Sequence, residues 1–161
     1  MNSDAGPSDF QTSDLPPEPI VKDESVKMLD EILLTLKLER AVIFTKSHLG
    51  WVVACSHEVP TEDFWNLAPL SLSVIQSAAL EKKTIHLVDA GASDRFGTQI
   101  SVVLTGIRSV ACAPYASPEG EVKALLYADN RISTGAFSPK DVETLEELAQ
   151  ELGRRLFERN T

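Results

Sequence analysis

The sequence has little cysteine, no long apolar run and no sign of a secretory leader. Only two of its 161 residues are cysteine, Cys55 and Cys112, and their spacing fits neither a metal site nor a disulfide framework. We interpret both as buried thiols of a reducing, cytoplasmic compartment. No apolar run approaches the roughly 18 residues of a membrane-spanning helix, so we expect no membrane association. The N-terminus also lacks a basic stretch followed by an apolar one.

Positive charge is scarce as well. Fifteen Lys and Arg stand against 24 Asp and Glu, a net charge of −9, which argues against nucleic acid as a partner because phosphate binding needs clustered bases. No Gly-rich phosphate loop, paired-carboxylate arrangement or nucleophile elbow is present. His48, His57 and His86 lie in separate segments without acidic or thiol partners at ligand spacing. We therefore expect no metal, no cofactor and no catalytic activity.

The chain reads as one α+β domain behind a polar tail. Residues 1–20 are acidic and proline-rich and are expected to be disordered, which leaves residues 21–160 for the folded domain. Apolar periodicity predicts helices over 22–38, 71–83 and 139–158, and a short helix over 98–104. Strands are predicted over 41–45, 51–55, 84–88, 108–115 and 121–129.

The predicted strand 108–115 is apolar on both of its faces. Ala111 and Ala113 alternate with Val110 and Cys112, as in a central strand that is covered on both sides. Two hairpins flanked by terminal helices indicate an antiparallel sheet. If the terminal helices cover one face, residues 67–104 remain for the other, and a loop-rich layer there would form a small-molecule pocket.

Several segments resemble the GAF domain family. "SLSVIQSAALEKKTIHLVDAGASDRFG" is similar to the middle of such domains, and "IRSVACAPYASPEGEVKALLYADNRISTGAFSPKDVETLEELAQELGRRL" is similar to their C-terminal half. The resemblance covers roughly residues 24–158. It implies a GAF/PAS-like antiparallel sheet of five to six strands, with terminal helices on one face and loops and short helices on the other. It also points to bacterial signalling proteins, notably enhancer-dependent transcription activators.

The turn after the last predicted strand carries the most specific of these motifs. Asn130, Phe137 and Asp141 match a pattern of the nucleotide-binding members, whereas Arg131 replaces a lysine and Val142 replaces the final glutamate. The missing glutamate weakens the case for a cyclic nucleotide.

We interpret Asn130, Arg131, Phe137 and Asp141 as a structural clamp. Ser138 is expected to cap the last helix, Asp141 to favour its positive end, and Arg131 to form an ion pair with Asp141. Such a clamp needs no ligand to explain it.

Candidate ligand contacts lie in the loop over the predicted pocket and on the strand beneath it. They are Asp94, Arg95, Phe96, Ser101, Arg108 and Cys112. An arginine in this loop would suit an anionic ligand. The alternative is a surface turn with Phe96 in the core, which would make the domain a protein-interaction or adaptor module with a filled pocket. A GAF-type methionine sulfoxide reductase is less favoured, because its loop cysteines have no counterpart and both thiols here lie in predicted strands.

The terminal helices carry more apolar residues than one sheet face needs. We expect a homodimer through Leu34, Leu145, Leu152, Gly153 and Leu156, with Gly153 admitting a second helix at close range. Pairing through terminal helices is also what the family resemblance implies. The sequence thus predicts a non-catalytic regulatory domain that senses a small ligand, dimerises, or binds a signalling protein.

Overall fold

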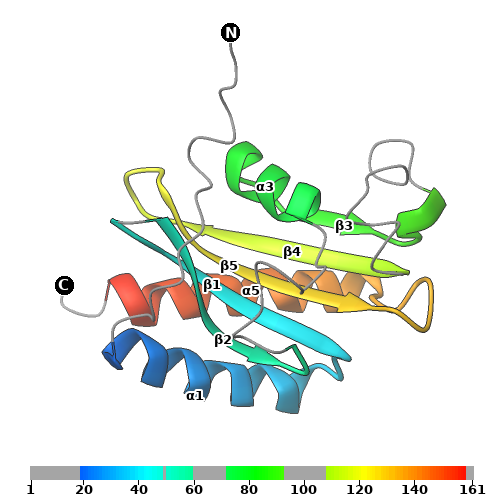
Figure 1. Cartoon of the computed structure of the whole chain (residues 1–161), viewed down its shortest axis with the longest axis horizontal. Coiled ribbons are helices and arrows are strands. Elements are labelled where there is room, and N and C mark those ends of the chain that lie inside the picture. Colours follow the sequence, from blue (N-terminus) through cyan, green and yellow to red (C-terminus); the bar gives the residue numbers. More distant parts are fainter. Residues whose placement is uncertain (1–18, 49, 60–71, 93–107, 159–161) are drawn as a thin grey trace, which may run out of the picture.

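The computed structural model describes residues 19–48, 50–59, 72–92 and 108–158. Within these ranges five strands form one antiparallel sheet of order β2-β1-β5-β4-β3 (Figure 1). The strands are β1 (Arg40–Ser47), β2 (Gly50–His57), β3 (Ile85–Leu87), β4 (Ser109–Ala116) and β5 (Val122–Asn130). The helices are α1 (Pro19–Thr35), α3 (Leu72–Glu81) and α5 (Pro139–Phe157), with a 3-10 turn, η2, at Ala90–Ala92. The predicted α+β class and its five strands are confirmed.

The helix boundaries differ little from those predicted. α1 begins at Pro19, three residues before the expected start, so the part of the predicted tail before it, residues 1–18, lies outside the described ranges, as does the predicted helix over 98–104. None of the described helices is long and apolar enough to cross a membrane.

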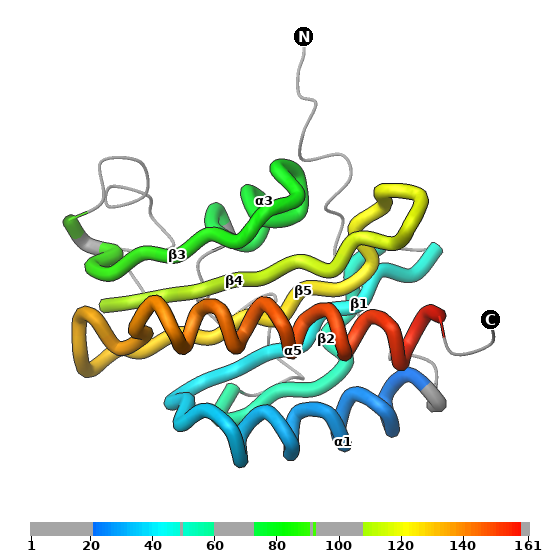
Figure 2. Tube along the Cα trace, turned by 180° about the vertical axis from the view of Figure 1, so that it is seen from behind, coloured from blue at the N-terminus to red at the C-terminus, as the bar shows by residue number. Residues whose placement is uncertain are grey.

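The sheet is covered on both faces. α1 and α5 lie side by side on one face, as the view from behind shows, and α3 lies on the other (Figure 2). The Arg155 guanidinium joins the two terminal helices through hydrogen bonds of 2.9 and 3.3 Å to the Glu31 carboxylate. Two apolar cores result, one under α3 and one under α1 and α5.

Strict alternation along β4 separates these two cores. Val110 and Cys112 belong to the core under α3, whereas Ala111 and Ala113 belong to the core under the terminal helices. All four side chains are almost fully buried, as the apolar pattern on both faces predicted.

A capping box fixes the start of α5. The Ser138 hydroxyl accepts a hydrogen bond from the Asp141 amide at 3.0 Å, and the Asp141 carboxylate accepts one from the Ser138 amide at 3.1 Å. Pro139 follows in the first turn, where its missing N–H leaves no helical bond unmade. The predicted cap at Ser138 is therefore confirmed, and it is reciprocal.

The outer edge of β4 is covered only in part. β3 pairs with Val110 to Cys112 and ends there. Beyond it, the carbonyl of Pro114 accepts a hydrogen bond from Nε2 of Gln150 on α5 at 3.2 Å. Pro114 has no N–H, so its backbone offers no donor along this part of the edge.

The apolar stripe of α5 is used inside the protomer. Leu145, Leu152 and Gly153 are buried against the sheet, and the partly buried Leu156 packs on the same core, so the prediction that these residues form a dimer interface is wrong for the first three. The physical reason is that a helix needs the same apolar periodicity to cover a sheet as to meet another helix. Leu34 on α1 differs, because 89% of its surface is exposed.

Candidate functional site

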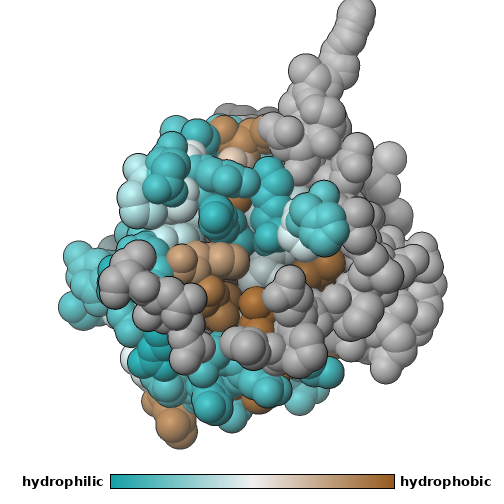
Figure 3. Space-filling view, turned by 90° about the vertical axis from the view of Figure 1, so that its left-hand side faces the viewer, coloured by the Kyte–Doolittle hydropathy of each residue, from teal (hydrophilic) through white to brown (hydrophobic). Residues whose placement is uncertain are grey.

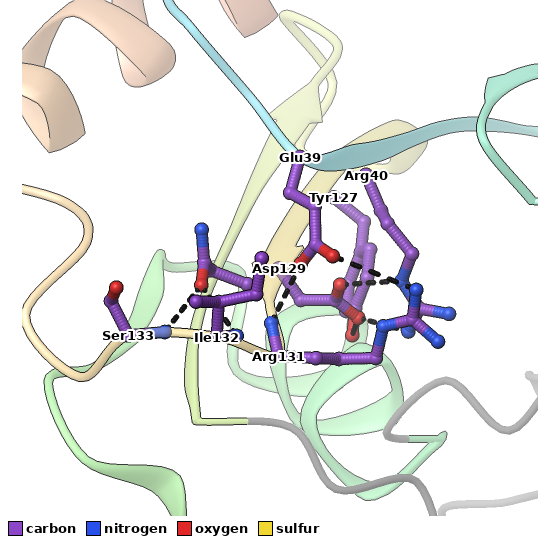
Figure 4. A network of polar contacts seen from close by, with 8 residues as sticks. Glu39, Arg40, Tyr127, Asp129, Arg131, Ile132 and Ser133 are labelled. Atoms are coloured by element: carbon purple, nitrogen blue, oxygen red, sulfur yellow. Dashed lines mark hydrogen bonds and ion pairs between the residues drawn. The ribbon is translucent and has the colours of Figure 1, made fainter.

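A buried polar triad lies where β1 begins and β5 ends. Nε and Nη2 of Arg40 donate hydrogen bonds of 2.7 Å to the two carboxylate oxygens of Asp129 (Figure 4). The Tyr127 hydroxyl donates to Asp129 Oδ2 at 2.6 Å. Arg40 is 4% exposed and the other two residues are fully buried, so the triad is a buried polar group among mostly apolar side chains.

Strand register brings the triad together. Arg40 lies opposite Asp129 in the β1–β5 ladder, and Tyr127 stands two residues earlier on the same face of β5. Burial alone would lower the pKa of Arg40, but its hydrogen bonds and its attraction to Asp129 raise that pKa above the ordinary value. The guanidinium therefore remains charged, and the bidentate geometry fixes its orientation.

An apolar floor adjoins the triad on the side of the sheet that α3 covers. It is formed by Val42 on β1 and by Val110 and Cys112 on β4, all without exposed surface. Val74, Ile75 and Ala78 of α3 pack on the same core. This face therefore combines an apolar surface with one oriented charge pair, and α3 packs directly on the apolar part.

The two thiols are poorly ionised in these surroundings. Burial raises the pKa of Cys55 to about 12, with a smaller contribution from the Asp30 carboxylate. Burial alone raises the pKa of Cys112 still further. A nucleophilic cysteine needs the opposite shift, so neither thiol is prepared for redox or covalent chemistry.

Comparison with known proteins identifies the family. The sequence model of the GAF domain matches residues 26–156, which is most of the chain. The chain belongs to the GAF domain family. A comparison with curated proteins gives no match.

Solved structures share the fold of this GAF domain. GAF3 of Slr1393 from Synechocystis, in its photoproduct state, gives a TM-score of 0.69 at 15% identity, with 87% of this chain and 95% of that chain covered. The GAF domain of a two-component sensor histidine kinase from Bacillus halodurans gives 0.58 at 14% identity, covering 86% and 94%. A free methionine-R-sulfoxide reductase from Neisseria meningitidis, in complex with its substrate, gives 0.62 at 17% identity, covering 85% and 81%. At these identities the similarity shows the fold alone.

The GAF domain closes the end of β5 with an Asx turn. Oδ1 of Asn130 accepts hydrogen bonds from the amides of Ile132 at 2.8 Å and Ser133 at 2.7 Å (Figure 4). The Ser109 hydroxyl on β4 donates to the Ser133 carbonyl at 3.0 Å. Asn130 therefore stabilises the turn, in keeping with its interpretation as a structural residue.

Arg131 does not form the predicted ion pair with Asp141. Its Nη2 lies 3.6 Å from Oε2 of Glu39, and its amide donates to Oε1 of Glu39 at 2.7 Å. Glu39 directly precedes β1, the neighbour of β5 in the sheet, and the Asp141 carboxylate is already engaged by the capping box. The clamp therefore joins β5 to β1 rather than to α5.

Phe137 anchors the segment that leads into α5. Its ring is buried in the core under the terminal helices and meets His86 of β3 edge to face, with ring centroids 6.4 Å apart. Nε2 of His86 is buried and has no hydrogen-bond partner in the described ranges. Burial lowers the pKa of His86, opposed in part by a hydrogen bond with the Phe137 backbone.

The predicted ligand contacts fall into two groups. Asp94, Arg95, Phe96 and Ser101 lie outside the described residues. Cys112 lies in the apolar floor, and Arg108 is exposed beside β4, where its amide donates to the Asn130 carbonyl at 2.8 Å.

The sequence interpretation missed Arg40 and did not connect Asp129 with Tyr127. One signal was available, because Arg40 opens the apolar run "RAVIFT" and Asp129 closes the apolar run "ALLYAD". Charges at the ends of two antiparallel neighbours lie opposite each other when the register aligns them.

A surface cleft lies at the end of the sheet away from the triad. This open cleft of about 320 Å³ lies between the end of α3 and the β4–β5 turn. The corresponding end of the molecule is mostly hydrophilic around a smaller apolar area (Figure 3). Two lysine contacts span it. Lys82 Nζ donates to the Gly120 carbonyl at 2.6 Å, and Lys46 Nζ lies 4.0 Å from Oε2 of Glu121. These contacts engage both lysines of the cleft, and we retain the triad face as the candidate site.

Proposed function

We propose that this GAF domain is a non-catalytic regulatory sensor of bacterial signal transduction that binds a small molecule on the sheet face bearing the triad. The observation that carries the proposal is the Arg40–Asp129 pair, buried beside the apolar floor of Val110 and Cys112. A buried ion pair is weak evidence for stability, because desolvation offsets most of its attraction. An oriented polar group beside an apolar surface is what a specific ligand site requires.

The triad favours a ligand that accepts hydrogen bonds. Asp129 engages Nε and Nη2 of Arg40, and within the described ranges no hydrogen bond uses Nη1. A carboxylate or phosphate oxygen would complement this remaining edge of the guanidinium. The floor of Val42, Val110 and Cys112 would receive the apolar part of the same molecule.

A reductase function is disfavoured by the state of the thiols. The chain contains two cysteines, and burial raises the pKa of both. Buried, protonated thiols fit a structural role in the reducing cytoplasm better than attack on a sulfoxide.

Ligand screening by thermal shift tests the sensor proposal. A panel of small carboxylates, phosphates and nucleotides is added to the wild type and to variants that still unfold cooperatively. We expect one class to raise the Tm of the wild type and of the exposed control Lys140→Ala, but not of Arg40→Gln or Cys112→Leu. Equal shifts in Cys112→Leu and the wild type would place the ligand elsewhere. No shift with any compound would favour the alternative, a protein-interaction module for a signalling partner.

A second proposal concerns self-association through α1. We infer a homodimer, as in signalling and transcription regulators that work as pairs, with Leu34 at the contact because its side chain is 89% exposed. Light scattering at about 100 μM tests this, since specific pairs of micromolar affinity assemble at that concentration. A monomer there, or a dimer that survives Leu34→Glu, would contradict the proposal.

A further inference from the structure

Gly153 forms a socket for an aromatic ring. A Cβ built on Gly153 of α5 would overlap the ring carbons Cγ, Cδ1 and Cδ2 of Tyr115 on β4. Tyr115 is 2% exposed and Gly153 is buried, so neither can move aside without disturbing the core. No side chain larger than hydrogen fits at position 153 while the ring is in place.

The same ring holds the rest of the last turn of α5. It stacks on Phe157 with centroids 6.2 Å apart and planes at 11°, and the Tyr115 hydroxyl donates to the Glu158 carboxylate. Lys123 of β5 lies 5.6 Å above the other aromatic ring, that of Phe157. Tyr115 therefore contacts the end of α5 at Gly153, at Phe157 and at the C-cap residue Glu158.

These contacts add to others that hold the last turn, in which Arg155 bonds to Glu31 and Leu156 packs on the core. Glycine is the weakest helix former after proline, so residues 153–158 begin with an unfavourable position. The C-cap residue Glu158 donates its backbone N–H to the Arg154 carbonyl at 3.0 Å. The ring in the socket compensates for the glycine, and without the ring this turn should fray.

One strand connects the socket to the proposed ligand face. β4 carries Val110 and Cys112 toward α3 and Tyr115 toward α5, with a register irregularity beside Tyr115 at Ala116. A change in β4 under the ligand face therefore reaches the socket three residues away along the same backbone.

We propose that Tyr115 couples the α3 face of the sheet to the last turn of α5. The turn is helical while the ring occupies the Gly153 socket, and it opens when a shift of β4 withdraws the ring. The coupling gives the proposed ligand site its regulatory effect and in that respect rests on the proposed function. The coupling requires a second position of the ring, whose population changes at either site would shift.

A reciprocal substitution tests the socket. Gly153→Ala should lower the Tm because its methyl group meets the ring, and Tyr115→Ala should lower it because the turn loses its support. The double variant should be more stable than Tyr115→Ala alone, because alanine then improves the helix in an empty socket. If Tyr115→Ala does not fold, Tyr115→Leu replaces it in both the single and the double variant. A double variant less stable than its Tyr115 parent would overturn the socket.

Hydrogen exchange without any ligand tests the coupling. Cys112→Ala perturbs β4 from the α3 face, and Val42→Ala is the matched control, equally buried on the same face but on β1. We expect Cys112→Ala to speed exchange of residues 153–158 by about fivefold relative to residues 145–149, the effect of losing support for one helical glycine. Val42→Ala should not, and the effect should vanish in the Tyr115/Gly153 double variant. Equal effects of both substitutions, or an effect that persists in the double variant, would overturn the coupling. Since no ligand is used, a failed ligand screen leaves this result intact.

Discussion

Arg40 and Asp129 face each other across neighbouring strands and share two hydrogen bonds of 2.7 Å. Arg40 is the first residue of β1 and Asp129 the penultimate residue of β5, so the pair also aligns the two strands. Because both groups are buried, neither can exchange its partner for water. Removing one of them leaves a charge that the rest of the fold must tolerate.

Replacing one member of the pair should therefore destabilise the domain more than replacing both. Arg40→Met is expected to destabilise the domain by about 3–5 kcal/mol, because Asp129 remains buried and unpaired. Arg40→Met combined with Asp129→Leu should recover much of that loss. Urea denaturation measures both. Lys140→Ala is the exposed control, since its pair with Glu143 is solvated and contributes under about 1 kcal/mol.

The Asx turn should contribute more to the stability of the domain than the ion pair beside it. Asn130→Ala removes the acceptor of two backbone N–H groups and should cost about 1–2 kcal/mol. Arg131→Ala loses an exposed contact of 3.6 Å and should cost under about 1 kcal/mol. Equal losses in chemical denaturation would show that the turn is held by other contacts.

The capping box predicts a measurable loss at the start of α5. Ser138→Ala removes the acceptor for the Asp141 amide and should cost about 1 kcal/mol. Ser138→Asp keeps an acceptor at the cap and serves as the matched control, with stability near the wild type. Circular dichroism during thermal unfolding reports both, and indifference to Ser138→Ala would contradict the assigned cap.

His86 should make stability depend on pH in a defined direction. Its pKa in the fold is lower than in the unfolded chain, so below about 6.5 the unfolded state binds more protons. Stability should therefore be full above that pH and fall as the pH drops through the folded pKa. His86→Gln should flatten the dependence between pH 7.5 and 5.5, measured as urea midpoints. Gln replaces the exposed His48 in the control variant.

The cysteines should be slow to react in the folded state. With its pKa raised to about 12, Cys55 is almost wholly protonated at pH 8, and Cys112 is buried as well. We expect iodoacetamide to modify neither at a rate near that of a free thiol, and both after unfolding in urea. Mass spectrometry counts the adducts, and rapid native labelling at either position would overturn the assignment.

The fold was readable because its signals are local or periodic. The alternation through Val110, Ala111, Cys112 and Ala113 identified a central strand, and Ser138 identified the start of a helix. Such signals depend on neighbours in the chain, which any sequence displays.

The site was harder to predict because its residues meet through register. The apolar runs that Arg40 opens and Asp129 closes mark two strand ends, but only the register places these residues, 89 apart in the sequence, opposite each other. Arg131 likewise had two acidic candidates, and only the sheet order places Glu39 closer than Asp141. Gly153 was misassigned for the same reason, since a gap in a helix surface admits a partner helix or an aromatic ring from the same chain.

Pro114 and Gln150 block part of the edge of β4, and this affects how copies of the chain can assemble. Beyond β3, an incoming strand would meet Pro114, which offers no donor and whose carbonyl is already occupied by Gln150. Copies of this chain are therefore hindered from joining their sheets at this edge into a continuous ribbon. At Pro114 the small-residue strand β4 therefore cannot be extended by regular strand hydrogen bonds from another copy.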